Sequence, residues 1–425
     1  MSLVVRKSSP VVVRPSPDQV TMRGTIKLSS FDKSLNNVPE TSLLMFEHPI
    51  HNAAGTIQAA LSRALAHYYP IAGRIIAGGG SGGGGGDDDV YIDCNNEGVT
   101  FVAASTCQAL KEVICFDRSP DARKLLDELV VPYPAMACGP RDPLLMMQVT
   151  EFSCGGLVLG VTWNHGIADG VGMAQFLQAV GELAGGLSSP SVAPVSWDGS
   201  LPTLPPSVLD AEEEHLILDP INGDLATLDI TIPLQSIDQI RSDFSSRFHG
   251  QPCTTFEAVL AVLWRCRTRA IRLDPETPIL LMFVADVRKH VGAKEGYYGN
   301  CIIDQLVVAT SSAVADGDVK DVIMAIKHAK EQIPGRLRMT TGQHELCKVP
   351  AYHAMMVSSW RNLGFDRVDL GSGRPARVTT SGKHMPPAPS AQGFLSSGRD
   401  GVRVLSALVT EEHTDAFLAE LAKFM

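Results

Sequence analysis

The sequence predicts an α/β protein in which mixed sheets and helices form layers. Strand-like and helix-like segments both occur along the whole chain, but they do not follow a strict strand–helix–strand alternation. A stretch rich in Pro and Ser, residues 188–222, divides the 425 residues into comparable halves. Because domains usually contain about 100–200 residues, we expect an N-terminal domain over 1–187, a crossover linker over 188–222 and a C-terminal domain over 223–425.

The first half opens with a predicted helix at 55–69, whose apolar residues recur at helical spacing before Pro70 ends it. Residues 78–89, "GGGSGGGGGDDD", are of low complexity and lie between two strand-like pieces, which predicts a long hairpin tip. This run formally matches a nucleophile-elbow pattern and a dinucleotide-binding pattern. Both matches arise because almost every position is Gly, so neither indicates a function.

A hairpin and a helix follow in the first half. The runs "LLMMQVTEF" at 144–152 and "LVLGVTW" at 157–163 read as two strands joined by "SCGG". The segment 171–184 has one apolar face at helical spacing, and the glycines at 185–186 end the helix. The heptapeptide "NHGIADG" at 164–170 therefore lies where a strand stops and a helix begins.

The second half contains further strands and helices. We expect strands at 228–234, 278–288 and 401–410, a buried helix with a basic end at 255–271, and an amphipathic C-terminal helix at 410–424. Residues 384–396, "HMPPAPSAQGFLS", are expected to form a loop because Pro is frequent there.

Composition excludes several classes of protein. The net charge is −10 with a pI near 5.6, so nucleic acid is not an expected partner, and an anionic cofactor would need a local basic site. The nine cysteines are scattered without a CxxC pair, which favours free thiols in a reducing compartment. Neither a signal-peptide core nor an apolar run long enough for a membrane span is expected, so the cytoplasm is the predicted location.

The pair His165 and Asp169 has a structural and a catalytic interpretation. A His at a strand end is often purely structural, and an Asp before a helix is often an N-cap. The helix that begins near Gly170, however, offers free N–H groups suited to a developing oxyanion, and Gly166 permits close approach of a ligand. No second His completes a metal site, and no nucleophile elbow completes a Ser triad. A His without a nucleophilic partner usually acts as a general base, so we expect His165 to deprotonate an acceptor.

Several motifs now indicate a family. "NHGIADG" resembles the HxxxD motif of the plant BAHD acyl-CoA-dependent acyltransferases. Other stretches agree with that family in order and position: "HYYPIAGR" at 67–74, "GVTFVAA" at 98–104, "VTEFSCGGLVLGVTWNH" at 149–165, "CTTFEAVLAVLWRCRTRA" at 253–270, "GYYGN" at 296–300 and "VDLGSGRP" at 368–375. The last of these stands where the family has its DFGWG motif. The resemblance covers nearly the whole chain, and the ordered set is specific.

The resemblance implies a fold and a site. The fold would be two similar chloramphenicol-acetyltransferase-like domains of mixed sheet and helices, with a solvent channel between them. His165 would be the general base, and Asp169 would hold the loop by pairing with Arg288 of "ADVR". Acyl-CoA would be a co-substrate, with no resident cofactor and no metal, and the protein would be a monomer without nucleic-acid or membrane partners.

The chain departs from the family pattern in two places. Leu370 and Ser372 replace the Phe and Trp of DFGWG, while Asp369, Gly371 and Gly373 remain; we expect these three to be structural residues on the CoA side. Members that acylate shikimate or quinate carry an Arg two positions after a Trp. Here Trp360 is followed by Arg361 and then Asn362, so Trp360 and Asn362 are the acceptor-pocket candidates, and Arg361 could compensate for the missing Arg.

Asn362 in place of the Arg favours a neutral alcohol or an amine as the acceptor. The chain resembles cereal members that use hydroxycinnamoyl-CoA or benzoyl-CoA in plant specialised metabolism, which predicts an aromatic acyl donor. Two alternatives stay open. One is a non-catalytic protein of the same fold that binds acyl-CoA or a small aromatic compound. The other is a carrier-protein condensation domain, although such domains usually have a His where this chain has Asn164.

Overall fold

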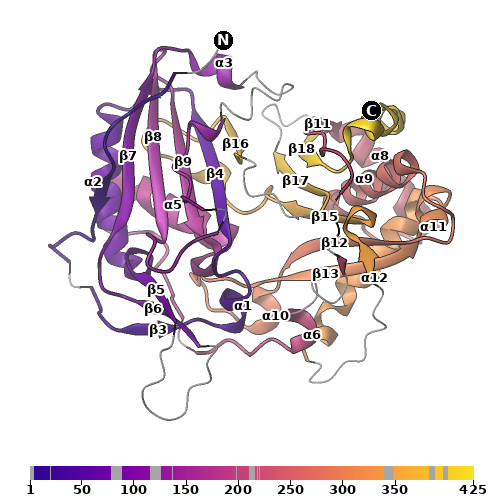
Figure 1. Ribbon diagram of the computed structural model, residues 1–425, viewed down its shortest axis with the longest axis horizontal. Helices are drawn as coiled ribbons and strands as arrows, with labels where there is room; N and C mark the ends of the chain where they lie inside the picture. Colours follow the sequence, from indigo (N-terminus) through magenta and orange to yellow (C-terminus); the bar gives the residue numbers. More distant parts are fainter. Residues whose placement is uncertain are drawn as a thin grey trace. The chain divides into compact units, whose positions relative to one another are not determined.

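The computed structural model describes residues 4–19, 21–77, 89–114, 126–135, 137–197, 199–209, 216–217, 219, 221–338, 348–381, 388–395 and 401–425. The chain folds into two compact units, and Figure 1 shows a sheet with packed helices in each. Unit 1 comprises Met1–Thr203, Val287–Ile302 and Asn362–His384, and unit 2 comprises Leu204–Asp286, Ile303–Arg361 and Met385–Met425. The chain therefore leaves unit 1 inside the predicted linker, but two later segments return to it.

Unit 1 is built on a seven-stranded sheet with the order β1-β7-β8-β9-β4-β16, and β2 also pairs with β7. The strands are β1 (Arg6–Lys7), β2 (Val11–Val13), β4 (Pro39–Phe46), β7 (Val99–Thr106), β8 (Leu145–Phe152), β9 (Leu157–Asn164) and β16 (Arg377–Thr379). The predicted hairpin is the β8–β9 pair, and all eight residues of β9 are buried, so both of its faces are covered.

Helices and a small sheet complete unit 1. Helices α2 (Ala53–His67) and α5 (Gly170–Ala184) pack on each other, in agreement with the two predicted helices. Strands β5 (Arg74–Ala77) and β6 (Val90–Asp93) pair antiparallel and form a three-stranded sheet with β3 (Thr25–Lys27). The predicted hairpin around the Gly-rich run thus has its two strands, while residues 78–88 lie outside the described residues. Short helical elements are α1 (Ser30–Lys33), η1 (Tyr69–Ala72), α3 (Leu110–Ile114), η2 (His165–Ile167), α10 (Arg288–Val291) and η4 (Phe365–Arg367).

Unit 2 has a six-stranded mixed sheet with the order β11-β18-β17-β15-β12-β13. Its strands are β11 (Leu228–Pro233), β12 (Pro278–Asp286), β13 (Ile302–Thr310), β15 (Ala354–Ser359), β17 (Ser390–Leu395) and β18 (Gly401–Ala407). The prediction of a loop over 384–396 was wrong for 390–395, which form β17. This strand pairs parallel with β15 and antiparallel with β18, so hydrogen bonds from distant segments override its weak local preference.

Helix α9 (Thr255–Ile271) is the centre of the unit 2 core, and its bounds match the predicted helix. It contacts α8 (Leu234–Arg247), α11 (Ser311–Ala315), α12 (Val319–Arg336) and α13 (Thr414–Leu421). A capping box starts α9: Glu257 N–H donates to Thr254 Oγ1 over 3.2 Å, and Thr254 N–H donates to Glu257 Oε2 over 2.8 Å. Within the basic end, Arg267 is fully buried and donates from Nε to the Leu408 carbonyl over 2.7 Å.

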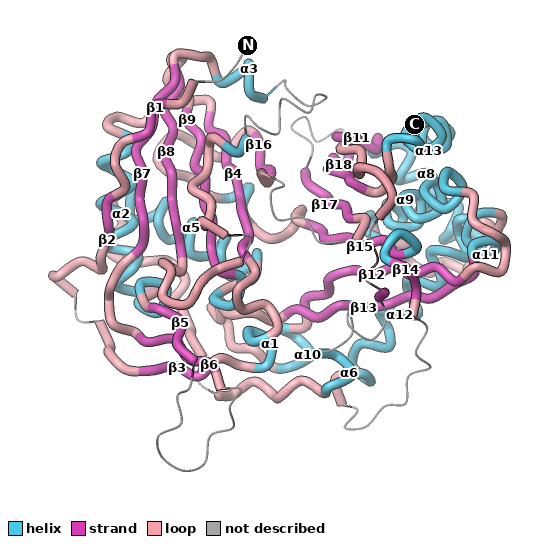
Figure 2. Tube along the Cα trace, in the orientation of Figure 1, coloured by secondary structure: helices cyan, strands magenta, loops and turns pink. Residues whose placement is uncertain are grey.

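Short elements complete unit 2, and Figure 2 distinguishes helices from strands in the described part of the chain. They are α6 (Pro206–Leu209), β10 (Leu216–Ile217), β14 (Val349–Pro350), η3 (Ala351–His353), η5 (Glu411–His413) and η6 (Ala422–Phe424). The predicted helix at 410–424 is therefore η5, α13 and η6 in succession. No helix within the described residues has the length and hydropathy needed to cross a membrane. The free thiols in the described part of the chain include Cys94, Cys107, Cys138, Cys154, Cys253 and Cys266.

Candidate active site

The HxxxD segment is held by its own backbone and by its neighbours in unit 1. At the end of β9, Asn164 caps the following turn η2 by accepting from Gly166 N–H at Oδ1 over 2.9 Å. The His165 N–H donates to the Val38 carbonyl over 2.8 Å. Trp163, which is fully buried, donates from its indole Nε1 to the Ala168 carbonyl over 2.9 Å. Bonds on both sides of His165 therefore fix the loop that carries its imidazole.

Asp169 is the N-cap of α5 and is almost fully buried. One carboxylate oxygen accepts from Gly172 N–H over 3.0 Å and from Arg288 Nη2 over 2.8 Å, and the other accepts from Cys301 N–H over 3.0 Å. The ion pair with Arg288, implied by the family resemblance, is thus present. All three donors belong to the protein framework, so this carboxylate joins α5 to the segment Val287–Ile302 and serves to hold the loop.

Asn300 fixes the tautomer of His165. The Asn300 amide Nδ2 donates to Asp32 Oδ1 and to the His165 carbonyl, each over 2.8 Å, so the amide oxygen must face the imidazole. That oxygen lies 3.0 Å from His165 Nδ1. Since an amide oxygen can only accept, Nδ1 carries the proton and Nε2 of the neutral ring keeps its lone pair.

Behind Asn300 lies a buried carboxylate, Asp32. It accepts from Asn300 at N–H over 3.1 Å and at Nδ2, from Ser29 at N–H over 3.1 Å and at Oγ, and from Trp197 at Nε1. Burial raises the pKa of Asp32 to about 6, while the hydrogen bonds from Ser29, Asn300 and Trp197 oppose that rise. These three residues hold Asp32, and Asp32 in turn orients the amide that contacts His165.

The electrostatic setting keeps His165 neutral. Burial lowers the pKa of the imidazole below its ordinary value, and the nearby charge of Asp169 and the contact with Asn300 only partly offset this effect. In the described part of the chain, no residue forms a hydrogen bond with Nε2. A neutral ring with a protonated Nδ1 and an available Nε2 is the state that a general base requires.

The DFGWG-like segment is a local turn of unit 1. The exposed Asp369 accepts from Gly371 N–H over 2.8 Å and from Gly373 N–H over 3.0 Å. Both glycines have positive φ, 99° and 90°, which explains why Gly stands at these two positions. Leu370 is buried, so the residue that replaces the family Phe packs inside the unit. Asp369, Gly371 and Gly373 therefore shape a turn of their own segment.

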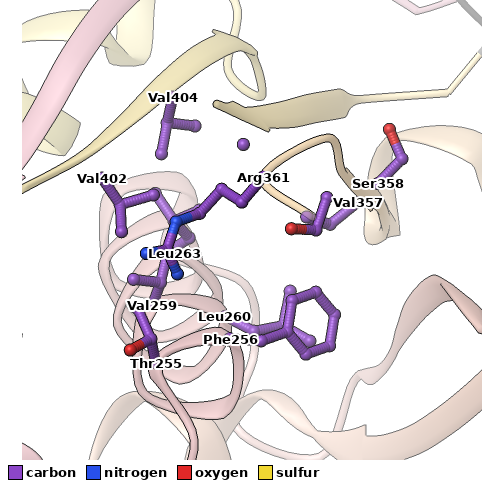
Figure 3. A pocket seen from close by; sticks show the side chains of 12 residues that line it. Thr255, Phe256, Val259, Leu260, Leu263, Val357, Ser358, Arg361, Val402 and Val404 are labelled. Carbon is purple, nitrogen blue, oxygen red and sulfur yellow. The ribbon is translucent and has the colours of Figure 1, made fainter. Parts of the chain in front are cut away.

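The acceptor-pocket candidates fall on either side of the division between the units: Trp360 is largely buried in unit 2, and Asn362 is exposed in unit 1. Their part in acceptor binding stays a prediction. Between them, Arg361 extends into a pocket of unit 2 (Figure 3). The pocket is lined mainly by apolar residues of α9, β15 and β18, such as Val259, Leu263 and Val404, and its free space of about 20 Å³ holds roughly one water molecule. Burial lowers the pKa of the Arg361 guanidinium.

Two residues of this network were not predicted from the sequence. Asn300 ends the "GYYGN" block, and Asp32 stands three positions after Ser29 at capping-box spacing, so each has a local signal. Neither local signal relates these residues to His165. Asn300 contacts His165 across 135 residues of sequence, and Asp32 contacts Asn300 across 268 residues. In the part of the chain that the structure describes, no cluster of His, Cys, Asp and Glu could hold a metal ion.

Known proteins are similar to this chain along its whole length. A family model described as "Transferase family" matches residues 4–418. "Acyl transferase 15" of rice is 44% identical over 100% of this chain and 99% of its own length. A myricetin 3-O-glucosyl 1,2-rhamnoside 6'-O-caffeoyltransferase, AT2, of Crocosmia x crocosmiiflora is 30% identical over 100% of both chains. The 3'-N-debenzoyl-2'-deoxytaxol N-benzoyltransferase of Taxus canadensis is 28% identical over 94% of this chain and 92% of its own.

A solved structure supports the fold. The crystal structure of vinorine synthase matches with a TM-score of 0.74 over 99% of this chain and 98% of its own, at 20% identity. The family model covers almost the whole chain, and the rice relative is well above 30% identity over its full length. The chain belongs to this transferase family, the BAHD acyl-CoA-dependent acyltransferases.

Proposed function

We propose that this protein transfers an aromatic acyl group from CoA to a small alcohol or amine, with His165 as the general base. The observation that carries the proposal is the contact of His165 Nδ1 with Asn300 Oδ1 at 3.0 Å. It leaves Nε2 as the proton acceptor of a ring whose pKa is lowered by burial.

The reaction proceeds in a ternary complex. Nε2 of His165 takes the proton of the acceptor O–H or N–H while that oxygen or nitrogen attacks the thioester carbonyl. The C–S bond of the tetrahedral intermediate then breaks, and the imidazolium returns the proton to the departing thiolate. The products are an ester or amide and free CoA. Asn300 accepts from Nδ1–H throughout, so it also stabilises the transient imidazolium.

The names of two relatives support the choice of donor. One relative is named as a caffeoyltransferase and another as an N-benzoyltransferase. We therefore propose hydroxycinnamoyl-CoA or benzoyl-CoA as the donor. The residue two positions after Trp360 is Asn362 rather than Arg, which favours a neutral alcohol or an amine over an acidic acceptor. We further propose that the enzyme acts as a monomer in the cytoplasm, in plant specialised metabolism.

The first test replaces His165 by Ala. We expect a loss in kcat of at least about 10²–10⁴-fold, which is the usual contribution of general-base catalysis. Release of free CoA thiol is measured from p-coumaroyl-CoA and benzoyl-CoA, with and without pools of aromatic alcohols, amines, polyamines and shikimate.

The matched control is His290→Ala, because His290 is exposed on α10. Retention of most activity in His165→Ala would contradict the assignment of the base. Release of CoA thiol without any acceptor would indicate that the protein hydrolyses the thioester rather than transferring the acyl group. No release from any mixture would favour the non-catalytic binding protein.

A further inference from the structure

Strand β4 carries a carboxyl group, Glu40, that the acyl-transfer steps described above do not use. Strands β4 and β9 run side by side (Figure 1), and Glu40 lies directly opposite Trp163 in this antiparallel pair. The pairing continues beyond the end of β9, because His165 N–H donates to the Val38 carbonyl over 2.8 Å. Opposite residues of an antiparallel pair, and residues two apart on one strand, point to the same face. Glu40, Trp163 and His165 therefore share one face of the sheet.

The same register gives the spacing of the two titratable groups. Glu40 is the diagonal neighbour of His165, and such neighbours lie about 7–8 Å apart, within reach of long side chains. The rings of Trp163 and His165 agree with a shared face, since their centroids are 6.4 Å apart. One small molecule can therefore contact the carboxyl group of Glu40 and the imidazole of His165 at the same time.

Glu40 and His165 are also the accessible residues of this part of the sheet. Within 39–46 and 157–169, every residue is buried except these two, which are half-buried. Removal of water from around them still shifts both groups toward the neutral form. It raises the pKa of Glu40 to about 7 and lowers the pKa of His165 below its ordinary value. A ligand that reaches His165 thus meets a carboxyl group in a poorly hydrated setting.

The carboxyl group of Glu40 has acceptor positions to spare. Among the described residues it accepts a hydrogen bond only from its neighbour Thr41, whose N–H lies 3.0 Å from Oε1. The two other carboxylates near the catalytic loop, Asp32 and Asp169, each accept from several donors on distant parts of unit 1. An ionised carboxylate with one hydrogen bond is unfavourable where water is scarce, and a cationic donor on a ligand would satisfy it.

We propose that Glu40 binds an ammonium group of the acceptor, so that the preferred acceptor carries a positive charge as well as its nucleophile. The ammonium donates a charge-assisted hydrogen bond to the carboxylate. The nucleophile of the same molecule, a neutral amine or a hydroxyl, then lies at Nε2 of His165. Short diamines and amino alcohols have both groups. The inference rests on the proposed function for its catalytic meaning, whereas binding of the ammonium does not.

Calorimetric titration of the full-length protein with 1,4-diaminobutane and with butane-1,4-diol tests the site, because the two probes differ in charge and hardly in length. We expect the diamine to bind at least about tenfold more tightly than the diol. Glu40→Gln should weaken binding of the diamine about 10-fold or more, since a hydrogen bond between charged groups is lost, and should leave the diol unchanged. Glu40→Asp should keep part of the preference, and Glu47→Gln, at an exposed position after β4, should keep all of it.

Three outcomes overturn the proposal. A wild-type protein that binds the diamine no better than the diol would exclude an ammonium site. Unchanged affinity for the diamine in Glu40→Gln would place the site elsewhere. An equal loss for both probes would give Glu40 a structural role instead, and thermal melting of Glu40→Gln shows whether the fold is affected.

The transfer assay separates this inference from the proposed function. With an active acyl-CoA donor, Glu40→Gln should raise KM for the diamine about 10-fold or more, with a smaller change in kcat. A protein that binds the diamine through Glu40 and releases no CoA thiol from any donor would contradict the proposed function alone. Transfer to neutral alcohols that Glu40→Gln leaves unchanged, without use of the diamine, would contradict this inference alone.

Discussion

Two segments of unit 1 each place an Asp beside glycines, and they have different roles. Asp169 of the HxxxD segment is buried and receives donors from Arg288 and Cys301, more than 100 residues away. Asp369 of the DLGSG segment is exposed and receives donors from Gly371 and Gly373, within four residues. A carboxylate with distant partners holds separate parts of the chain together, whereas one with neighbouring partners shapes only its own turn.

The backbone and the side chain of Asp369 have separate effects. The DLGSG segment is fixed to unit 1 by its buried Leu370 and by a close approach of α5. A Cβ added at Gly181 would lie 2.3 Å from the Asp369 carbonyl oxygen. The backbone of Asp369 thus matters to the packing of α5, although its side chain serves the local turn. Four substitutions test the difference between the two segments.

The largest effect is expected from Asp169→Ala. The substitution removes the Asp169 carboxylate from the guanidinium of Arg288, whose side chain is 15% exposed, and also removes the N-cap of α5. Breaking such a pair from one side costs about 3–5 kcal/mol. Urea denaturation should report this loss together with a fall in transfer activity, and Asp369→Ala is its matched control. Equal stability of Asp169→Ala and Asp369→Ala would show that the two carboxylates contribute alike to the fold, contrary to the roles assigned here.

A smaller effect is expected from Asn300→Ala, on activity and also on stability, because Asp32 Oδ1 and the His165 carbonyl lose a buried donor. Without the amide oxygen, Nδ1–H loses its acceptor and the tautomer is no longer selected. We expect kcat to fall about 10- to 100-fold, which corresponds to the roughly 1–3 kcal/mol of an unmade hydrogen bond, with KM little changed. Asn222→Ala, an exposed Asn, is the control.

The pH profile gives this variant a second readout. Burial lowers the pKa of His165 below its ordinary 6.5, so kcat/KM of wild type should rise with pH through an inflection below 6.5 and then level off. Because the contact with Asn300 raises the pKa of His165, Asn300→Ala should move that inflection to lower pH. An inflection that moves upward would contradict the assigned hydrogen bond.

Gly181→Ala tests the close approach between α5 and the DLGSG segment. Its methyl group would overlap the Asp369 carbonyl, and backbone atoms cannot turn away as a side chain can. Overpacking of this kind costs about 1–3 kcal/mol. Thermal melting of Gly181→Ala beside Gly185→Ala, whose Cβ would meet no atom closer than 3.5 Å, measures the effect. Equal melting temperatures would show that the approach is not tight.

The smallest effect is expected from Asp369→Ala. It removes two hydrogen bonds from an exposed turn, so we expect a loss of stability of about 1 kcal/mol or less and transfer activity within about threefold of wild type. The transfer activity of Asp369→Ala is measured by steady-state kinetics, with the acyl-CoA donor identified in the CoA-release assay. A loss of activity as large as that of Asn300→Ala would give this Asp a catalytic role.

Local pattern predicted some elements almost residue by residue. Helix α9 has a capping box at Thr254, an apolar face and a length that exceeds a strand, so its bounds follow from the sequence. The apolar runs and the Gly-containing turn of 144–163 likewise predict β8 and β9. Strand β17 was not predicted because the segment before it is rich in Pro. Helix α8 was not predicted because it has few apolar residues among many polar ones.

By itself, the sequence determined the family, the catalytic His165 candidate and the place of that residue between a strand and a helix, because these depend on local order and on an ordered set of motifs. Only the tertiary structure decided which atoms meet that His. The contacts Asp32–Asn300 and Asn300–His165 join segments far apart in the chain, and no local preference encodes them. They form because a buried carboxylate and a buried amide must find partners once folding has excluded water from around them.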